Sequence, residues 1–303
     1  MISKDNKICK LIEIYFYVCK KFEEDLKNYC ERMSNNNKPE FTDEEMMCVY
    51  IYGISQEQRF KVKQIYEFAD EHLRSWFPKL PSYSAFDNRL NKLSEAFAQM
   101  IGHLIKEFMP KDCIKGTSIL DSMPIITCSG RRKGKVAESI TDKGYCSTKG
   151  IYYYGIKVHA LGFRRENHMP FPEEILITSA SENDLNVFKN SWSNIGNRTF
   201  YGDKIYFNKN YFSELANTNN SVMLTPVKET KGQSEYEKQF DRAANDLFSK
   251  YVSKIRQPIE SFFNWLIVKT EIQKASNVRS AKGLIVHTFG KIAAALIYLI
   301  FNS

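Results

Sequence analysis

The spacing of the hydrophobic residues changes at about residue 112, and this change limits the architectures that the chain can adopt. Before that point apolar residues recur every three or four positions, as they do from Phe86 to Leu104, and this period indicates amphipathic helices. After it, shorter apolar segments with the alternation of strands occur at residues 117–127, 151–163 and 174–180. We therefore expect an all-helical region followed by a region that contains a sheet.

Strand-like and helical patterns then alternate toward the C-terminus. The spacing predicts helices at 182–192 and 209–218, a helical tract from about 235 to 272, and two further strands at 199–206 and 221–227. Three strands followed by helix, strand, helix, strand and helix are typical of an α/β domain. In such a domain the first three strands form a meander, and the later strands enter the sheet through helical crossovers.

The region before residue 112 has helical patterns at about 43–52, 55–76 and 82–108, with Thr42 as a predicted N-cap. Two interpretations remain open. One is a helix-turn-helix-like DNA-binding region, in which Arg89 and Lys92 face the DNA. The other is a helical bundle that packs on the rest of the chain or on a second protomer.

The apolar segment at 284–301 is interrupted by His287 and Lys291, so a buried core helix is expected rather than a membrane span.

Charge and cysteine usage restrict the class of protein. Lys and Arg total 43 against 35 for Asp and Glu, and the net charge of +8 favours a polyanionic partner. The seven cysteines form no CxxC pair, which argues against a disulfide framework and against a zinc site. Acids and lysines interrupt the first apolar segment, unlike the core of a signal peptide. A cytoplasmic location, reduced buried thiols and no membrane association are the resulting expectations.

Three carboxylates lie in apolar surroundings. Asp121 ends an apolar run in the strand predicted at 117–127, Asp203 lies in YGDKIY, and Glu260 lies on a helix crowded with Phe and Trp. If the strands that carry the aspartates are neighbours and the last helix packs across them, the acids converge. Such a cluster is stable only when it is protonated or bound to metal, and its oxygens suit Mg²⁺ or Mn²⁺. Two such ions would support in-line phosphoryl transfer.

The segments ILDSMPI, YGDKIY and RQPIESFFNWL, in this order, resemble the DDE transposases of bacterial insertion sequences. LPSYSAFDNRLNKL extends the resemblance to the insertion-sequence 982 family. It implies a ribonuclease H-like mixed sheet with flanking helices over 113–303, preceded by the helical region 1–112. It also implies catalytic and metal-binding roles for Asp121, Asp203 and Glu260, with Mg²⁺ as the cofactor and Mn²⁺ as a substitute.

The last helix departs from the tyrosine, arginine, glutamate and lysine signature of related families. Arg256 matches the arginine, but Ser253 and Leu266 occupy the tyrosine and lysine positions, and Lys269 is one turn later. Arg256 either pairs with Glu260 or holds a phosphate. Asp184 is expected to cap the helix that follows it, and a position lining the site is the alternative.

Basic residues are predicted to contact DNA phosphates. For the run after Asp121 the alternative is a solvated hairpin, but its position directly after this strand and its glycines favour contact with DNA. The predicted DNA-binding residues are Arg131, Arg132, Lys133, Lys135, Lys157, Arg256, Lys269, Arg89 and Lys92.

The resemblance implies an enzyme that cuts double-stranded DNA at the terminal inverted repeats of a transposon and joins it to target DNA, as a homodimer in the synaptic complex. The two alternative functions are a ribonuclease H-like nuclease without strand transfer and a host-recruited DNA-binding protein with an inactive core.

Overall fold

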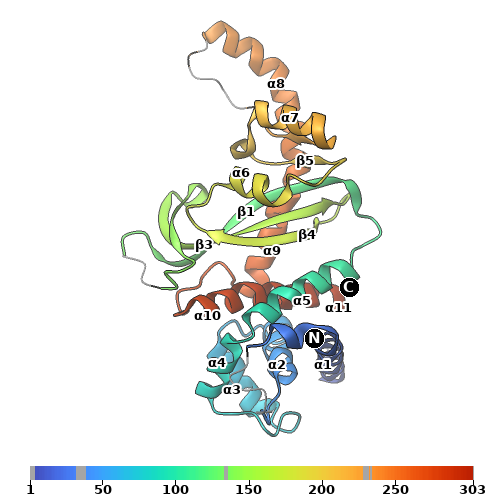
Figure 1. Ribbon diagram of the computed structural model, residues 1–303, viewed down its shortest axis with the longest axis vertical. Helices are drawn as coiled ribbons and strands as arrows, with labels where there is room; N and C mark the ends of the chain where they lie inside the picture. The colour runs from blue at the N-terminus through green and yellow to red at the C-terminus, as the bar shows by residue number, and fades with distance from the viewer. Residues whose placement is uncertain (1–3, 32–38, 133–135, 228–231, 233, 303) are drawn as a thin grey trace. The chain divides into compact units, whose positions relative to one another are not determined.

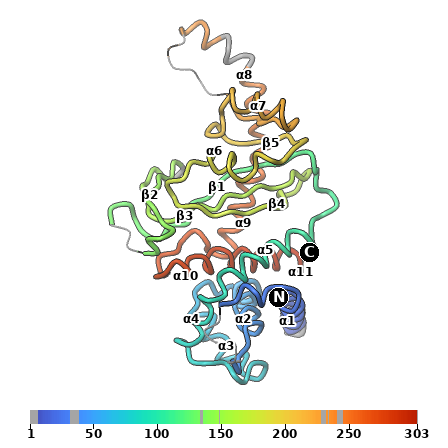
Figure 2. Tube along the Cα trace, viewed as in Figure 1, coloured from blue at the N-terminus to red at the C-terminus, as the bar shows by residue number. Residues whose placement is uncertain are grey.

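The computed structural model describes residues 4–31, 39–132, 136–227, 232 and 234–302 of the chain, and the other positions are grey in Figure 2. The chain divides into two compact units. The helical unit comprises Met1–Phe108, Ile125–Thr141 and Leu266–Ser303, and the sheet unit comprises Met109–Pro124 and Asp142–Trp265. All seven cysteines are free thiols; four are buried, Cys19 and Cys128 are partly exposed, and the expectation of burial was wrong for Cys9, which is exposed.

Helices from both ends of the chain build the helical unit. Thr42 begins the second helix with the predicted cap, because its hydroxyl accepts from the Glu45 N–H while the Glu45 carboxylate accepts from the Thr42 N–H. The buried residues of this helix pack against the apolar C-terminal helix. The helices are α1 (Lys4–Glu24), α2 (Asp43–Ser55), α3 (Val62–His72), α4 (Tyr83–Asn91), α5 (Ser94–Glu107), α10 (Ala281–Ile285) and α11 (Lys291–Phe301).

Two of the predicted helices were too long. The helix expected at 82–108 is divided between α4 and α5, because the Lys92 N–H bonds back to the carbonyls of Arg89 and Leu90 and closes α4. The helix expected at 55–76 is reduced to α3.

One helical stretch, Ala281–Phe301, is long and apolar enough to cross a membrane by length and composition. Of its most apolar window, 61% is buried inside the protein, which is how a core helix of the helical unit behaves. A turn of π-helix at Val286–Gly290 joins its two helices.

A mixed sheet forms the centre of the sheet unit (Figure 1). The strand order is β2-β3-β1-β5-β6, with β4 also paired to β3. The pairs β2/β3 and β3/β4 are antiparallel, whereas β1/β5 and β5/β6 are parallel. This order confirms the predicted meander and the mixed, ribonuclease H-like sheet. The strands are β1 (Ile114–Ser129), β2 (Asp142–Cys146), β3 (Ile151–Arg164), β4 (Phe171–Ser179), β5 (Thr199–Tyr201) and β6 (Val222–Leu224).

The parallel strands are shorter than expected, and one strand was missed. The strand predicted at 199–206 ends at Tyr201, because Asp203 starts a turn of 3-10 helix at Lys204–Tyr206. The strand predicted at 221–227 is limited to β6. β2 was not predicted, since its sequence DKGYC has no apolar alternation.

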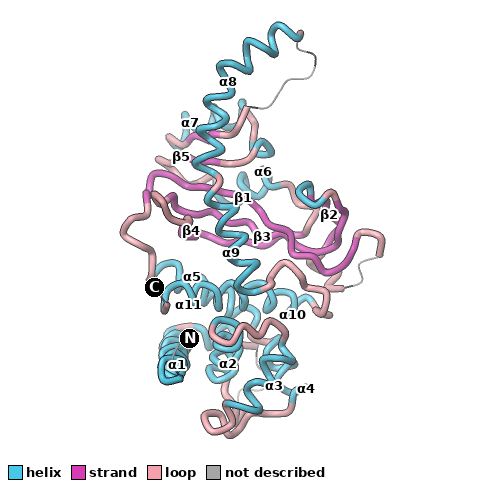
Figure 3. The backbone as a smooth tube through the Cα atoms, turned by 180° about the vertical axis from the view of Figure 1, so that it is seen from behind, coloured by secondary structure: helices cyan, strands magenta, loops and turns pink. Residues whose placement is uncertain are grey.

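Helices cover both faces of this sheet. α6 (Asp184–Val187), which continues as π-helix through Trp192, lies over one face in Figure 1. α8 (Glu235–Arg256) lies on the side of the other face, in front of the strands in Figure 3. The helical tract predicted at 235–272 is divided, since α9 (Pro258–Thr270) starts anew at a proline that cannot continue the hydrogen bonds of α8. α7 (Lys209–Asn219) connects β5 to β6.

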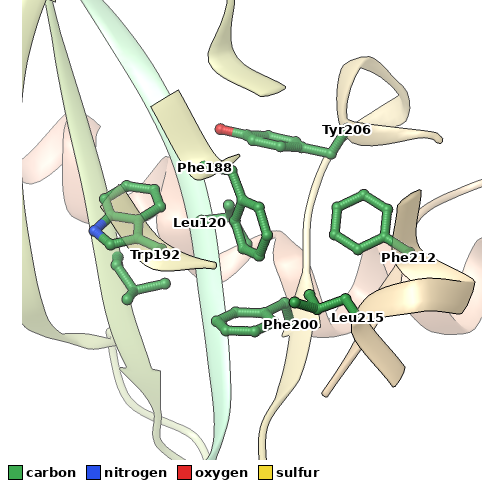
Figure 4. Close-up of a cluster of buried hydrophobic side chains, with 8 residues drawn as sticks. Leu120, Phe188, Trp192, Phe200, Tyr206, Phe212 and Leu215 are labelled. Atoms are coloured by element: carbon green, nitrogen blue, oxygen red, sulfur yellow. The ribbon is translucent and has the colours of Figure 1, made fainter. Parts of the chain in front are cut away.

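An aromatic cluster fixes α6 and α7 to the sheet (Figure 4). Leu120 of β1 points into this cluster, and the period of two along a strand therefore directs Asp121 to the opposite face. The members of the cluster are Leu120, Leu161, Phe188, Trp192, Phe200, Tyr206, Phe212 and Leu215.

Candidate active site

Asp121 lies on β1 with a side chain that is 22% exposed. One carboxylate oxygen accepts the Ser122 N–H at 2.8 Å, and the other accepts from Nη1 of Arg256 at 2.8 Å. Burial raises the pKa of Asp121 to about 6, and the nearby carboxylates of Asp203 and Asp184 act in the same direction. Arg256 opposes this rise. Asp121 is thus a carboxyl group whose negative charge depends on a neighbouring cation.

The register of the parallel strands places Asp203 next to Asp121. Ile119 pairs with Tyr201, and two residues further along each chain lie Asp121 and Asp203. Asp203 is exposed, and its carboxylate accepts the Lys204 N–H at 2.6 Å at the start of the 3-10 turn. The turn needs glycine at position 202, because a Cβ there would lie 2.7 Å from the Tyr206 ring. The second aspartate is therefore held by a tight turn at the end of β5.

Glu260 joins this group through Arg256. α8 ends at Arg256, and Glu260 lies in the first turn of α9 with 55% of its side chain exposed. The guanidinium donates through Nη1 to Asp121 and through Nη2 to Glu260. Of the two roles left open for Arg256, the structure shows the pairing with Glu260. A cavity of about 610 Å³ is lined by Asp203, Arg256 and Glu260.

Asp184 is a fourth acid beside the centre, and the role expected for it was wrong. Asn183 caps α6 by accepting the Leu185 N–H, whereas the buried Asp184 accepts from the Lys157 ammonium at 2.9 Å. Its other oxygen accepts from the Ser122 hydroxyl at 2.9 Å. Asp184 thereby supports the residue that follows Asp121. The apolar segments around the acids give no sign of this contact in the sequence. The available signal is Ser122 itself, because the residue after Asp121 on a strand directs its hydroxyl to the face that α6 covers.

The donors of this site fit a divalent cation. Carboxylate oxygens are the ligands that Mg²⁺ and Mn²⁺ prefer, and one cation, the Arg256 guanidinium, already links two of the acids. Among the buried side-chain atoms that the structure describes, Nε of Arg256 and the hydroxyl of Tyr206 have no hydrogen-bond partner. The chemistry of the donors thus agrees with a metal centre.

A group of closely spaced side chains that could bind a metal lies in the helical unit. Within the described ranges, one group of acidic and histidine side chains has its ligand atoms within 4.8 Å of one another, namely Glu24, His103 and Glu107 of the helical unit. The ammonium of Lys21 binds both glutamates, and Asp25 binds His103 at 2.7 Å. This group is therefore neutralised by the protein itself. The acids around Arg256 are spaced more widely.

The predicted DNA-contacting residues differ in their exposure and in whether they already bind acidic or aromatic side chains. Arg131 and Arg132 are exposed, and Lys133 and Lys135 lie outside the described residues. Lys157 and Arg256 bind the acids named above.

Two more cations of this set are engaged within the helical unit. The Lys269 ammonium lies 4.1 Å from the centroid of the Tyr298 ring. Arg89 is ion-paired with Asp43. Lys92, which is partly exposed, ends α4.

Comparison with known families gives one match. A family described as transposase DDE domain matches residues 111–277, which is 167 of the 303 residues and includes Asp121, Asp203 and Glu260. No curated protein matches the chain.

Proposed function

Because the chain belongs to the transposase DDE domain family, whose members cut DNA with divalent metal ions, we propose that it is an insertion-sequence transposase of the 982 type. It binds transposon ends and catalyses strand cleavage and strand transfer. The observation that carries this proposal is the meeting of Asp121 and Glu260 on one guanidinium, with Asp203 directly after β5, the parallel neighbour of the strand that carries Asp121.

Each acid has a distinct role in the proposed mechanism. Asp121 and Asp203 would together hold one Mg²⁺, and Glu260 would complete a second site, with Mn²⁺ as a substitute for Mg²⁺. Bound there, the ions supply activation of the attacking water or 3′-hydroxyl and stabilisation of the leaving oxygen.

Arg256 neutralises Asp121 and Glu260 in the absence of ions. With the acids bound to ions, its fork of donors would be available for a backbone phosphate. Asp184 keeps Ser122, and with it the middle of β1 next to Asp121, in place.

Binding of DNA involves both halves of the chain in this proposal. Arg131, Arg132, Lys133 and Lys135 contact phosphates of the terminal inverted repeat or of the target. Residues 1–112 form a DNA-binding region, and residues 113–303 form the catalytic domain. Two protomers pair two ends in a synaptic complex, and the enzyme is cytoplasmic and associated with the nucleoid when bound to DNA.

A strand-transfer assay with precleaved ends tests the proposal. With Mg²⁺ or Mn²⁺ the protein should join the ends to target DNA, and Asp121→Asn should reduce joining by at least about 10³-fold. Asp142→Asn, which removes an exposed carboxylate of β2, is the matched control and should retain activity. Hydrolysis without a joined product would instead indicate a nuclease. DNA binding without metal-dependent nicking would indicate a host-recruited binding protein.

A further inference from the structure

A second cavity, of about 780 Å³, lies within the helical unit. It is formed by the start of α3, by α4, by the loop at 274–280 and by Lys291 at the start of α11. Its volume is in the range of pockets that hold small ligands. Neither Asp121, Asp203 nor Glu260 lines it. A function for this cavity is therefore independent of the acidic centre.

The lysine in this cavity is almost completely buried. Lys291 is 2% exposed, and its ammonium lies 6.0 Å from the centroid of the Phe60 ring. In the part of the chain that the structure describes, no carboxylate lies within ion-pair distance of this ammonium. Burial lowers the pKa of Lys291 to about 7, and the charge of Glu271 opposes this shift only in part. A buried ammonium without a counter-ion is costly, which points to an anion that binds beside it.

The rest of the cavity wall also suits an anion. Lys61 is the N-cap of α3, and, for the residues described, no side chain caps this helix end. The first N–H groups of an eleven-residue helix thus lie at the cavity. The exposed ammonium of Lys63 also lines it and lies 3.6 Å from the carboxylate of Glu67. Lys274 and Arg279 contribute two more cations from the loop.

Apolar and aromatic side chains complete the wall. Tyr83, 38% exposed, and the partly buried Phe60 line the cavity together with Val62 and Val278. An aromatic surface beside a cluster of cations is the combination by which proteins hold a base and its phosphate. The two acids of the wall are Asp87, whose pKa is raised by burial, and Glu271.

We propose that this cavity binds a nucleotide, with Lys291 and the N-terminus of α3 on its phosphate and the aromatic wall against its base. The nucleotide belongs either to a DNA strand or to a free nucleoside phosphate, because both present the same chemistry. If it belongs to DNA, the site deepens the proposed function by fixing one unstacked nucleotide of the substrate.

The test measures binding to the full-length protein in EDTA, so that failure of the metal-dependent reaction does not affect it. The probes are a fluorescein-labelled five-nucleotide oligo(dT) and fluorescent ATP. Lys291→Met should weaken binding of at least one probe by about tenfold, because a charge-assisted hydrogen bond is lost. Lys106→Met, which removes an exposed lysine of α5, is the matched control and should change neither affinity by more than about twofold.

The two probes distinguish the sources of the nucleotide. A loss confined to oligo(dT) assigns the cavity to a DNA strand, and a loss confined to ATP assigns it to a free nucleotide. Unchanged affinity of Lys291→Met for both probes overturns the proposal. Near-UV circular dichroism checks that this variant folds. Lys61→Gln combined with Lys63→Gln changes only exposed rim residues, and it should weaken the same probe if the cavity is the site.

Discussion

The carboxylate of Asp121 accepts a hydrogen bond of 2.8 Å from the guanidinium of Arg256, although the two residues are 135 positions apart in the chain. Arg256 is only 16% exposed and also binds Glu260. This cation at the end of α8 therefore links β1 to the first turn of α9. Because burial raises the pKa of Asp121, this cation is what keeps the carboxylate ionised. The same oxygens are those we assign to the metal ions.

Replacing Arg256 should expose the repulsion among the acids. In EDTA, Arg256→Gln should lower the free energy of unfolding by about 2–4 kcal/mol, because it removes one partner of a largely buried pair. Addition of Mn²⁺ should raise the melting temperature of the variant more than that of the wild type. Lys238→Gln, a change on the same helix at a residue that does not line the cavity of the acids, is the control. Equal responses of the wild type and Arg256→Gln to Mn²⁺ would contradict a cation site at these acids.

Asp184 and Lys157 should be energetically coupled. Their side chains are 9% and 16% exposed and meet at 2.9 Å. Asp184→Asn and Lys157→Met should each lower the free energy of unfolding. The double variant should lose less free energy of unfolding than the sum of the two single losses, with a coupling energy of about 1–3 kcal/mol. Urea denaturation of the four proteins measures this coupling. Additive losses would show that the pair does not stabilise the fold.

A glycine of β2 should not tolerate a side chain. A Cβ at Gly144 would lie 2.5 Å from the Ala180 carbonyl oxygen, and this backbone atom cannot move aside easily. Gly144→Ala should lower the free energy of unfolding by about 1–3 kcal/mol. Gly116→Ala in β1 is the matched change, since a Cβ there meets nothing within 4 Å. Similar melting temperatures for the two variants would show that β2 is not packed as described.

Lys291 should make stability depend on pH above neutrality. Its pKa is about 7 in the folded chain against 10.5 for an ordinary lysine, so between these values the unfolded state binds more protons. Stability should therefore rise with pH from 7 toward 10, by at most about 1.4 kcal/mol per pH unit.

Burial lowers the pKa of the neighbouring His287 to about 3, so this residue stays neutral over the same range. The stability of Lys291→Met should not rise between pH 7 and pH 10, whereas the stability of Lys106→Met should rise as in the wild type. Urea denaturation at pH 7.5 and pH 9.5 compares them, and a rise of the same size in Lys291→Met would assign it to another group.

Much of the sheet unit could be predicted from local patterns. The alternation at 151–163 and 174–180 predicted β3 and β4. The convergence of Asp121 and Asp203 was conditional on their strands being neighbours, and the pairing of β1 with β5 supplies that condition. β2 was missed because its pairing with β3, rather than its own sequence, makes it a strand. The division between α4 and α5 was missed because apolar spacing continues across the turn at Lys92.

By itself, the sequence determined the types of element, their order and the three acids in apolar surroundings, because hydrophobic period and residue chemistry are local properties. Only the tertiary structure decided which cation each acid meets. Arg256 reaches Asp121, and Lys157 reaches Asp184, through contacts between separate elements. The burial of Lys291 was decided in the same way, since desolvation depends on what the surrounding helices exclude and not on the neighbouring residues in the chain.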